Sequence, residues 1–196
     1  MKKENVAIIR YNAGNIESVK NALDRLGVDS FVSGNPEAIR GADKVIFPGV
    51  GNAASAMTYL RVQQFDKLLC ELKQPVLGIC LGMQLLSNFS EEGNTKCLGI
   101  LPDKVKKFAG SEKIPHMGWN QISNLSSPLL NGVDEGSYVY FVHSYYLPVT
   151  DVTTAQTNYM EPFSAALKID NFYATQFHPE KSGEVGEHIL KNFIEL

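Results

Sequence analysis

Residues 77–84 read Leu77-Gly78-Ile79-Cys80-Leu81-Gly82-Met83-Gln84, a cysteine with a glycine two positions before it and another two positions after it. The apolar run before the cysteine is typical of a short strand, and the apolar positions after it begin a helical pattern. A sharp strand-to-helix turn needs small neighbours, because its strained backbone leaves little room for side chains. We therefore predict that Cys80 stands on such a turn, at a helix N-terminus, where the helix dipole favours a thiolate.

Strands and helices alternate around this stretch. Strands are expected at residues 6–10, 30–33, 44–47 and 75–79, and helices at 18–26, 53–72 (with a break) and 82–88. Asn35-Pro36 has the residues of a helix N-cap followed by proline at the first helical position. Such alternation predicts a parallel sheet with helices on both faces.

The second half of the chain is richer in strands. Residues 104–108, 138–143, 153–158, 163–169 and 172–177 have extended patterns, with turns predicted at Asp170-Asn171 and Asn131-Gly132. The final segment, 184–196, carries one apolar stripe, which indicates a helix packed on the core. Without a repeat, a low-complexity tract or a linker, the chain is expected to form a single α/β domain over residues 1–196 with an added, mostly antiparallel layer.

Composition and charge exclude several functional classes. The formal net charge of −3 and the pI near 5.8 give no electrostatic case for binding nucleic acid or an anionic membrane. No apolar run approaches the roughly 18 residues of a membrane span, and the first residues lack a signal-peptide pattern. The three cysteines and four histidines show no disulfide or metal-ligand spacing. We expect a cytoplasmic protein without a metal or a cofactor, and we assign no role to Cys70 or Cys97.

A second polar cluster stands much later in the chain, at Gln176-Phe177-His178-Pro179-Glu180. His178 and Glu180 are two positions apart, so an extended backbone projects both side chains from one face. A nucleophile, a base and a carboxylate that orients the base are the parts of a covalent acyl-transfer enzyme. Taken singly, Cys80 fits a buried structural cysteine, His178 a histidine beside a turn, and Glu180 a surface charge. Their combination favours catalysis.

The segment Pro48-Gly49-Val50-Gly51 directly follows the third expected strand. Acyl transfer requires backbone N–H groups aimed at the developing oxyanion, and glycines let a loop approach closely and reorient its peptides. We predict Gly49, Val50 and Gly51 as the oxyanion loop, with the amide of Leu81 as the second donor. The pattern Gly49-x-Gly51-x-x-Ala54 also matches a dinucleotide-binding fingerprint. Pro48, the position after a third strand and the absence of a ribose-binding acid argue against that alternative.

Further motifs point to a family. They are Tyr11-Asn12-Ala13-Gly14-Asn15, Pro115-His116-Met117-Gly118-Trp119-Asn120, Tyr140-Phe141-Val142-His143-Ser144-Tyr145 and Gln176-Phe177-His178-Pro179-Glu180-Lys181-Ser182. With them, the chain resembles the class I (triad) glutamine amidotransferases over essentially its whole length, and among these the glutaminase subunits of imidazole glycerol phosphate synthase. The resemblance implies a flavodoxin-like α/β fold, with a central, mostly parallel sheet, helices on both faces and an added antiparallel layer.

The resemblance also implies a reaction. Cys80 would attack the side-chain carboxamide of glutamine, His178 would act as general base and then as acid to the leaving ammonia, and Glu180 would orient the imidazolium. Water would release glutamate from the thioester, and no cofactor takes part. Matching positions place these residues at the glutamine site: Gly51, Gln84, His143, Ser144 and Tyr145.

A partner is implied as well. Ammonia would pass to a separate TIM-barrel cyclase subunit, in a heterodimer that makes imidazole glycerol phosphate and an aminoimidazole carboxamide ribotide in histidine biosynthesis. Because an unregulated glutaminase would waste glutamine, the oxyanion loop is expected to stay incompetent until the partner binds its ligand. The family places the partner beside the cysteine, and the expected interface residues are Asn15, Met117, Trp119, Tyr140 and Lys181. The alternatives are a core position for Trp119 and an ordinary surface position for Lys181.

Three other functions compete with this prediction. A paralogue that supplies ammonia to a sugar amidotransferase or another synthase would share most of these motifs. The glutaminases of anthranilate, guanylate or pyrimidine synthesis are disfavoured by the segment 116–120 and the loop 48–51. A catalytically silent binding module is disfavoured by the intact set of Cys80, His178 and Glu180.

Overall fold

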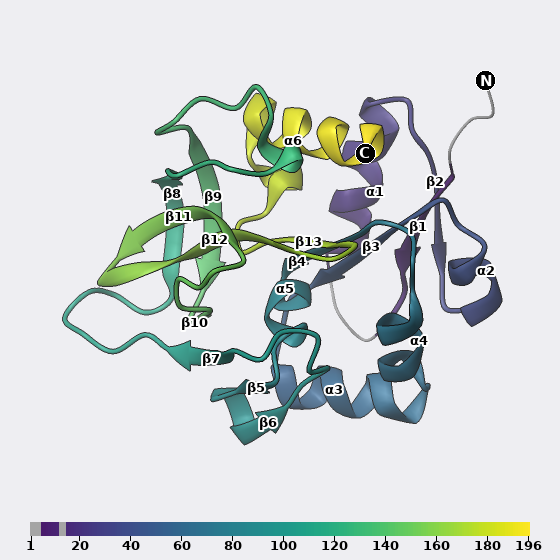
Figure 1. Ribbon diagram of the computed structural model, residues 1–196, viewed down its shortest axis with the longest axis horizontal. Helices are drawn as coiled ribbons and strands as arrows, with labels where there is room; N and C mark the ends of the chain where they lie inside the picture. The colour runs from purple at the N-terminus through teal and green to yellow at the C-terminus, as the bar shows by residue number, and fades with distance from the viewer. Residues whose placement is uncertain (1–4, 12–14) are drawn as a thin grey trace.

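A seven-stranded sheet forms the centre of the computed structural model, which describes residues 5–11 and 15–196 (Figure 1). The strands β2, β1, β3, β4 and β13 lie side by side and run parallel, and β12 and β11 continue the same sheet antiparallel. Their bounds are β1 Asn5–Ile9, β2 Asp29–Ser33, β3 Lys44–Gly49, β4 Val76–Cys80, β11 Thr153–Tyr159, β12 Glu161–Ile169 and β13 Phe172–Thr175. Residues 12–14 of the predicted motif at 11–15 lie outside the described residues.

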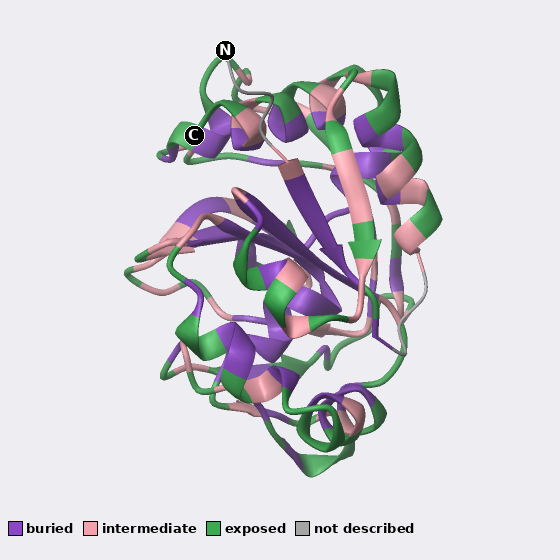
Figure 2. Ribbon diagram, turned by 90° about the vertical axis from the view of Figure 1, so that its right-hand side faces the viewer, coloured by how far each residue is buried: buried purple, intermediate pink, exposed green. Residues whose placement is uncertain are grey.

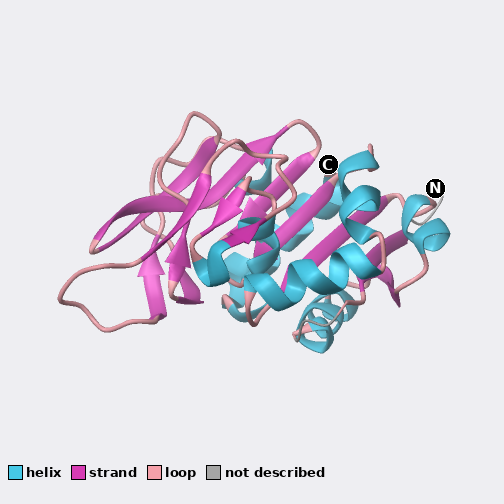
Figure 3. Ribbon diagram, turned by 90° about the horizontal axis from the view of Figure 1, so that it is seen from below, coloured by secondary structure: helices cyan, strands magenta, loops and turns pink. Residues whose placement is uncertain are grey.

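Helices cover both faces of this sheet, as Figures 1 and 3 show. Buried residues of α1 and α6 belong to one core cluster, and those of α2 to α5 belong to the other. The bounds are α1 Ile16–Arg25, α2 Pro36–Arg40, α3 Ala53–Val62, α4 Phe65–Glu71, α5 Leu81–Leu85 and α6 Gly183–Glu195. The side chains of Asn35 and Asn52 accept hydrogen bonds from the first N–H groups of α2 and α3, so the predicted cap at Asn35 is confirmed. The predicted parallel sheet with helices on both faces is confirmed too.

The remaining strands form two smaller sheets. A four-stranded sheet has the order β10-β7-β5-β6, and β8 and β9 form an antiparallel pair, here called the β8–β9 hairpin. The bounds are β5 Phe89–Ser90, β6 Thr95–Lys96, β7 Lys104–Lys107, β8 His116–Gln121, β9 Tyr138–His143 and β10 Tyr145–Tyr146, with 3₁₀ turns η1 Glu92–Asn94, η2 Pro128–Leu130 and η3 Pro179–Lys181. The end of the molecule around this hairpin consists of strands and loops (Figure 3).

Several predicted elements differ in extent from the observed ones; the strand expected over 172–177, for example, ends at Thr175. The helix expected over 82–88 ends at Leu85, because the N–H groups of Leu86 and Ser87 close tighter turns onto Met83 and Gln84. The Ser87 hydroxyl also donates to the Gln84 carbonyl at 2.7 Å, and such local bonds compete with helix continuation. The break expected within 53–72 lies between α3 and α4, where Gln64 has a φ of 59°. A strand over His116–Gln121 was not predicted.

Burial is concentrated in the strands of the central sheet, while the outer faces of the helices are exposed (Figure 2). The stripe predicted for the last helix is confirmed at Ile189, Leu190 and Phe193, which are fully buried in α6. Over the described part of the chain, every helix is too short or too polar to cross a bilayer.

Candidate active site

The strand β4 ends at Cys80, and the chain turns directly into α5. Cys80 has φ 54° and ψ −107°, a conformation that costs a residue with a side chain about 1–3 kcal/mol. The surrounding fold holds this strain, because the residue is buried and lies between β3 and β13. The predicted strand-to-helix turn is therefore present, with Cys80 at the point where β4 ends and α5 begins.

Space around the turn explains its glycines. A Cβ added at Gly82 would overlap the carbonyl oxygen of Phe47, and a Cβ at Gly78 would lie 3.1 Å from the carbonyl of Gly82. Gly49, which pairs with Cys80 across the two strands, has the Tyr11 hydroxyl 2.5 Å from the position of a Cβ. A side chain at any of these positions would push β3, the turn or α5 out of place.

His178 and Glu180 meet just after β13. The extended backbone predicted for this segment is wrong, because β13 ends at Thr175 and Pro179–Lys181 forms the 3₁₀ turn η3. The His178 Nδ1 atom lies 2.7 Å from Glu180 Oε1, and both side chains are inaccessible to solvent. The Asn15 amide donates to the same carboxylate oxygen, and the backbone N–H of His178 donates to the Tyr140 carbonyl at 2.9 Å. With Nδ1–H directed at the carboxylate, Nε2 is left as the atom that takes or gives a proton.

The imidazole of His178 is held in its protonated form by its neighbours. Burial acts to lower the pKa of His178, but the negative charge of Cys80 and the hydrogen bond to Glu180 outweigh it, and the pKa lies above its ordinary value. His178 Nε2 is buried without a hydrogen bond of standard geometry, so Cys80 acts on it chiefly through charge. A thiolate beside an imidazolium is the arrangement that activates a cysteine nucleophile.

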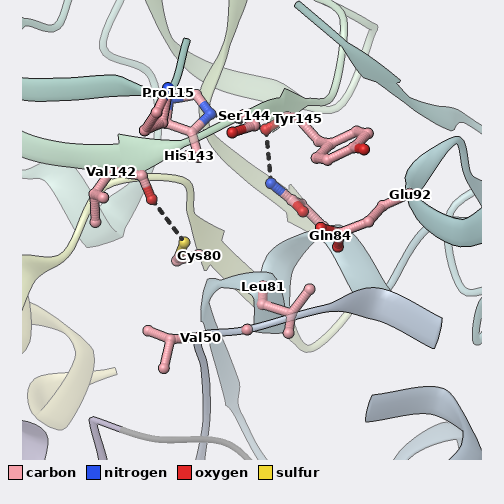
Figure 4. Close-up of a pocket in the computed structure, with 11 residues that line it drawn as sticks. Val50, Cys80, Leu81, Gln84, Glu92, Pro115, Val142, His143, Ser144 and Tyr145 are labelled. Carbon is pink, nitrogen blue, oxygen red and sulfur yellow. Dashed lines mark hydrogen bonds between the residues drawn. The ribbon is translucent and has the colours of Figure 1, made fainter. Parts of the chain in front are cut away.

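A pocket of about 340 Å³ opens onto the Cys80 sulfur. Figure 4 shows Val50 and Leu81 on one side of it, and Val142, His143, Ser144 and Tyr145 on the other. The residues that line it are Val50, Gly51, Cys80, Leu81, Gln84, Glu92, Pro115, Val142, His143, Ser144 and Tyr145. Each of the five residues expected at the glutamine site is among them, whereas His178 and Glu180 are not.

One carbonyl organises the polar wall of this pocket. The Tyr145 carbonyl accepts hydrogen bonds from Gln84 Nε2 at 2.7 Å and from His143 Nδ1 at 2.8 Å. His143 Nε2 lies 3.0 Å from His116 Nδ1. Burial lowers the pKa of His143 to about 3 and that of His116 to about 4. Both rings are therefore neutral at physiological pH, and each has one donor and one acceptor nitrogen.

Comparison with known proteins agrees with this geometry. Residues 7–196 match the family described as Glutamine amidotransferase class-I. The chain belongs to this family. It is 60% identical to the imidazole glycerol phosphate synthase subunit HisH of Bacteroides fragilis (strain YCH46), over 97% of this chain and 99% of that protein. It is 47% identical to the HisH subunit of Escherichia coli (strain K12), over 98% of this chain and all of that protein.

These identities place the chain among the HisH subunits of the class-I glutamine amidotransferases, as predicted, and make it an enzyme. A solved structure of a glutamine amidotransferase superposes with a TM-score of 0.75, at 18% identity and 97% coverage of each chain. The predicted class I amidotransferase fold is thereby confirmed.

Sequence reasoning missed three residues of this pocket: Glu92, Pro115 and Val142. Glu92 Oε2 accepts a hydrogen bond from the Ala53 N–H at 2.7 Å, and burial raises the pKa of Glu92. Its position depends on α3 and η1 packing together, which no local pattern reveals. Pro115 and Val142 stood inside quoted motifs, but nothing in their residue types marks them as pocket residues.

Of the five residues expected at a partner interface, three are exposed and two are half-buried. Met117 and Trp119 are 62% and 55% exposed, Tyr140 is half-buried and Lys181 is exposed. The ring of Trp119 packs edge-on against Tyr140 with centroids 6.1 Å apart, so Trp119 is not a core aromatic. Asn15 is half-buried and bonded to Glu180. Among the described residues, no group of three or more His, Cys, Asp or Glu side chains is placed to hold a metal ion.

Proposed function

We propose that this chain hydrolyses glutamine to glutamate and ammonia with Cys80 as nucleophile, His178 as base and acid, and Glu180 as the carboxylate that orients the imidazole. The observation that carries the proposal is the strained turn at Cys80, which faces a pocket and interacts electrostatically with the buried His178, whose Nδ1 lies 2.7 Å from Glu180 Oε1. A buried cysteine or a histidine–carboxylate pair is common in proteins without this activity, but the convergence of all three groups is what acyl transfer requires.

The reaction follows from these positions. The Cys80 thiolate attacks the carboxamide carbon, and the oxygen takes up the negative charge. The carbon–nitrogen bond then breaks as imidazolium Nε2 of His178 gives its proton to the leaving ammonia, which leaves a γ-glutamyl thioester. Water attacks the thioester and gives a proton to Nε2, and glutamate leaves as the Cys80 thiolate re-forms beside the imidazolium. Glu180 stays ionised and holds Nδ1–H throughout.

The oxyanion needs two N–H donors. Leu81 is the first residue of α5, so its N–H has no partner inside the helix. The loop Gly49-Val50-Gly51 supplies the second donor in this proposal. Gly51 has a φ of 111°, a conformation that glycine adopts without strain, so its peptides can reorient when the loop becomes competent.

The pocket fits glutamine in its charges as well as its size. Glu92 is the one carboxylate among the described residues that line the pocket, and we infer that it binds the α-ammonium group. Such a contact would offset the desolvation that raises the pKa of Glu92. Gln84, His143, Ser144 and Tyr145 then line the path between the α-carbon and Cys80, with the His143 ring kept neutral by burial.

The outer face of the β8–β9 hairpin is the proposed docking surface for a cyclase subunit. Its exposed or half-exposed side chains are Met117, Trp119, Tyr138 and Tyr140. Large aromatic residues are the usual anchors of protein interfaces, and Lys181 and Asn15 are expected at its margin. Free ammonia is mostly protonated in water, so a dry path from Cys80 into the partner preserves its nucleophilicity.

The HisH names of the relatives assign the ammonia to imidazole glycerol phosphate synthesis. In this proposal the chain acts as one domain over residues 1–196 and works in the cytoplasm, with glutamine as substrate and the cyclase as partner. A paralogous role toward another acceptor would keep the same pocket and change only the docking surface.

The test is glutamate release from glutamine by the purified chain, alone and then with the cyclase subunit of the same genome, with and without the ribulosyl substrate. We expect slow release by the isolated chain, strong stimulation by the liganded partner, and no release from Cys80→Ala. Activity that ignores the cyclase would move the ammonia to another acceptor. Unchanged activity of Cys80→Ala would refute the assigned chemistry.

A further inference from the structure

Gln176 is a buried polar residue to which the mechanism above assigns no part. It follows β13 directly, is fully buried, and is not among the residues that line the pocket. Its backbone N–H donates to the Ala165 carbonyl at 2.8 Å, which holds the main chain in place. Its side-chain Nε2 donates to the Cys80 sulfur at 3.6 Å, and its Oε1 accepts from Gln84 Nε2 at 2.9 Å.

The direction in which this amide points is dictated by its neighbours. The Tyr145 carbonyl can only accept, so the Gln84 atom that faces it must be the NH₂ group. The second hydrogen of that NH₂ group then requires an acceptor from Gln176, and Oε1 fills this role. Gln176 is left with its own NH₂ group directed at the sulfur.

The same carbonyl fixes a second branch of the network. His143 Nδ1 must donate to the Tyr145 carbonyl, so His143 Nε2 accepts from His116 Nδ1. His116 Nε2 then accepts from the Asn120 amide at 3.3 Å. Asn120 is next to Trp119 on β8. The hydrogen bonds therefore connect the β8–β9 hairpin, through the Tyr145 carbonyl and Gln84, to Gln176.

We propose that Gln176 is a positioning residue for the nucleophile: its amide donates a hydrogen bond to the Cys80 sulfur and is held in that direction by Gln84 and the Tyr145 carbonyl. The proposal rests on the assignment of Cys80 as nucleophile. The two protonation states of the cysteine have different partners. A thiol can donate to the Val142 carbonyl, 3.8 Å from the sulfur, whereas a thiolate needs a donor, and Gln176 supplies one. The bond therefore favours the reactive thiolate.

Two titratable groups from other elements also interact with the Cys80 sulfur. His178 does so from the end of β13, and Tyr11 from the end of β1. Burial and the charge of Cys80 raise the pKa of Tyr11 far above its ordinary value, so Tyr11 stays neutral in any practical assay. His178 is the one of the two that titrates, and it is unchanged in the variants below.

The experiment measures how fast iodoacetamide alkylates Cys80 at neutral pH in the full chain, with the modified peptide quantified by mass spectrometry to separate it from Cys70 and Cys97. Gln176→Glu keeps the acceptor for Gln84 but removes the donor to the sulfur. Gln176→Met removes both the acceptor for Gln84 and the donor to the sulfur without burying a charge. It replaces Gln176→Glu in the experiment if the glutamate variant does not fold. We expect alkylation to slow by about 10-fold or more in each, as for a lost hydrogen bond to a charged group.

Steady-state kinetics in the complex with the cyclase subunit provide the second measurement. Because Gln176 does not line the pocket and Gln176→Glu keeps the acceptor for Gln84, we expect kcat of Gln176→Glu to fall by a similar factor while its KM for glutamine changes by less than about twofold. The matched control is Thr175→Val, which removes a buried hydroxyl that donates to the Phe177 carbonyl at 3.0 Å. We expect this variant to have a lower free energy of unfolding but an unchanged rate of Cys80 alkylation.

The outcomes separate the two proposals. Wild-type alkylation in folded Gln176→Glu and Gln176→Met overturns the role of Gln176, even if Cys80→Ala is inactive. Slowing by the same factor in Thr175→Val also overturns it, because the effect would then be structural. If Cys80→Ala keeps full glutaminase activity, the proposed function fails, but the alkylation rates still report on the contact between Gln176 and the sulfur.

Discussion

The turn at Cys80 and the outer face of the β8–β9 hairpin are built in opposite ways. Cys80 is 6% exposed, with a strained backbone and glycine neighbours that have no room for a methyl group. Trp119 is 55% exposed on the strand β8. A nucleophile must be held within a fraction of an ångström, which only a packed backbone provides, whereas an interface anchor must be left uncovered until a partner arrives.

The hairpin contains the same contrast within itself. Its inward face carries His116, Phe141 and His143, which are all buried; the two histidines are hydrogen-bonded to each other, and His143 lines the pocket. Its outward face carries the exposed side chains of Trp119 and Tyr138 and the half-buried ring of Tyr140. Because side chains alternate across a strand, a single pair of strands serves both the pocket and the docking surface. Five predictions test this division, using four substitutions that each touch one region and leave the other intact.

The largest effect is expected from Cys80→Ala. Removing the nucleophile eliminates the covalent route, so glutamine hydrolysis in the complex should fall by roughly ten-thousand-fold or more. Affinity for the cyclase subunit should stay within about twofold, because the side chain lies beneath the surface. Glutamate release and a binding titration measure the two quantities. Weakened cyclase binding would show that the two regions are not separate.

Gly82→Ala tests the space at the turn. Alanine normally stabilises a helix relative to glycine, yet here the new Cβ would overlap the Phe47 carbonyl. We expect the free energy of unfolding, measured with urea, to fall by about 3 kcal/mol. Gly34→Ala is the matched control, because the nearest atom to its added Cβ is 3.6 Å away. Equal stability of the two variants would contradict the steric argument.

Trp119→Ala tests the outer face of the hairpin. Truncating an interface anchor should weaken cyclase binding by about 2 kcal/mol, or roughly 30-fold. Glutaminase activity at saturating cyclase should be preserved. Val62→Ala is the control, since Val62 is 72% exposed on α3, away from the hairpin. A similar loss of binding in the control would place the interface elsewhere.

The inner face is tested by pH. The folded pKa of His143 is about 3, below the ordinary value near 6.5, so the unfolded chain binds a proton that the native state rejects. The contribution of His143 to stability should therefore fall as pH drops below about 6.5, by up to about 1.4 kcal/mol per pH unit, and His116, whose pKa burial also lowers, adds a contribution of the same sign. His178, whose pKa is raised, contributes in the opposite direction and only above that range.

Urea unfolding of the wild type and of His143→Gln between pH 5 and pH 6.5 isolates this contribution. Between these pH values, the free energy of unfolding of the variant should depend on pH less steeply than that of the wild type, by the slope that one bound proton contributes. Parallel curves for the two proteins would mean that His143 is charged in the fold, contrary to its burial and its bond to the Tyr145 carbonyl.

The smallest effect is expected from Trp119→Ala on the isolated chain. Because the ring is largely exposed and packs only edge-on against Tyr140, the free energy of unfolding should change by less than about 0.5 kcal/mol. Thermal denaturation without the partner measures it. A loss of several kcal/mol would instead make Trp119 a structural residue of the hairpin.

Much of the fold was predictable because its signals are local. The alternation of apolar strands with helices, the Asn35 cap and the break between α3 and α4 each depend on residues a few positions apart. The strand His116–Gln121 was missed because a glycine and two amide residues obscure its alternation, and its pairing with β9 supplies what the local pattern lacks. The helix after Cys80 was overextended because the Ser87 hydroxyl competes for a carbonyl that continued helix would have used.

The strand-to-helix turn at Cys80 and the alternating pattern of the sheet are predictable from the sequence, because each depends on residues close together in the chain. An extended backbone was expected to bring His178 and Glu180 together, but a 3₁₀ turn does so instead. Over longer separations, tertiary packing sets which polar groups meet. The Asn15 amide reaches Glu180 across 165 positions, Gln84 reaches Gln176 across 92, and His116 reaches His143 across 27. Hydrogen bonds and desolvation act between neighbours in space, so the identity of a buried donor's partner, and the charge of a buried histidine, follow from packing rather than from sequence order.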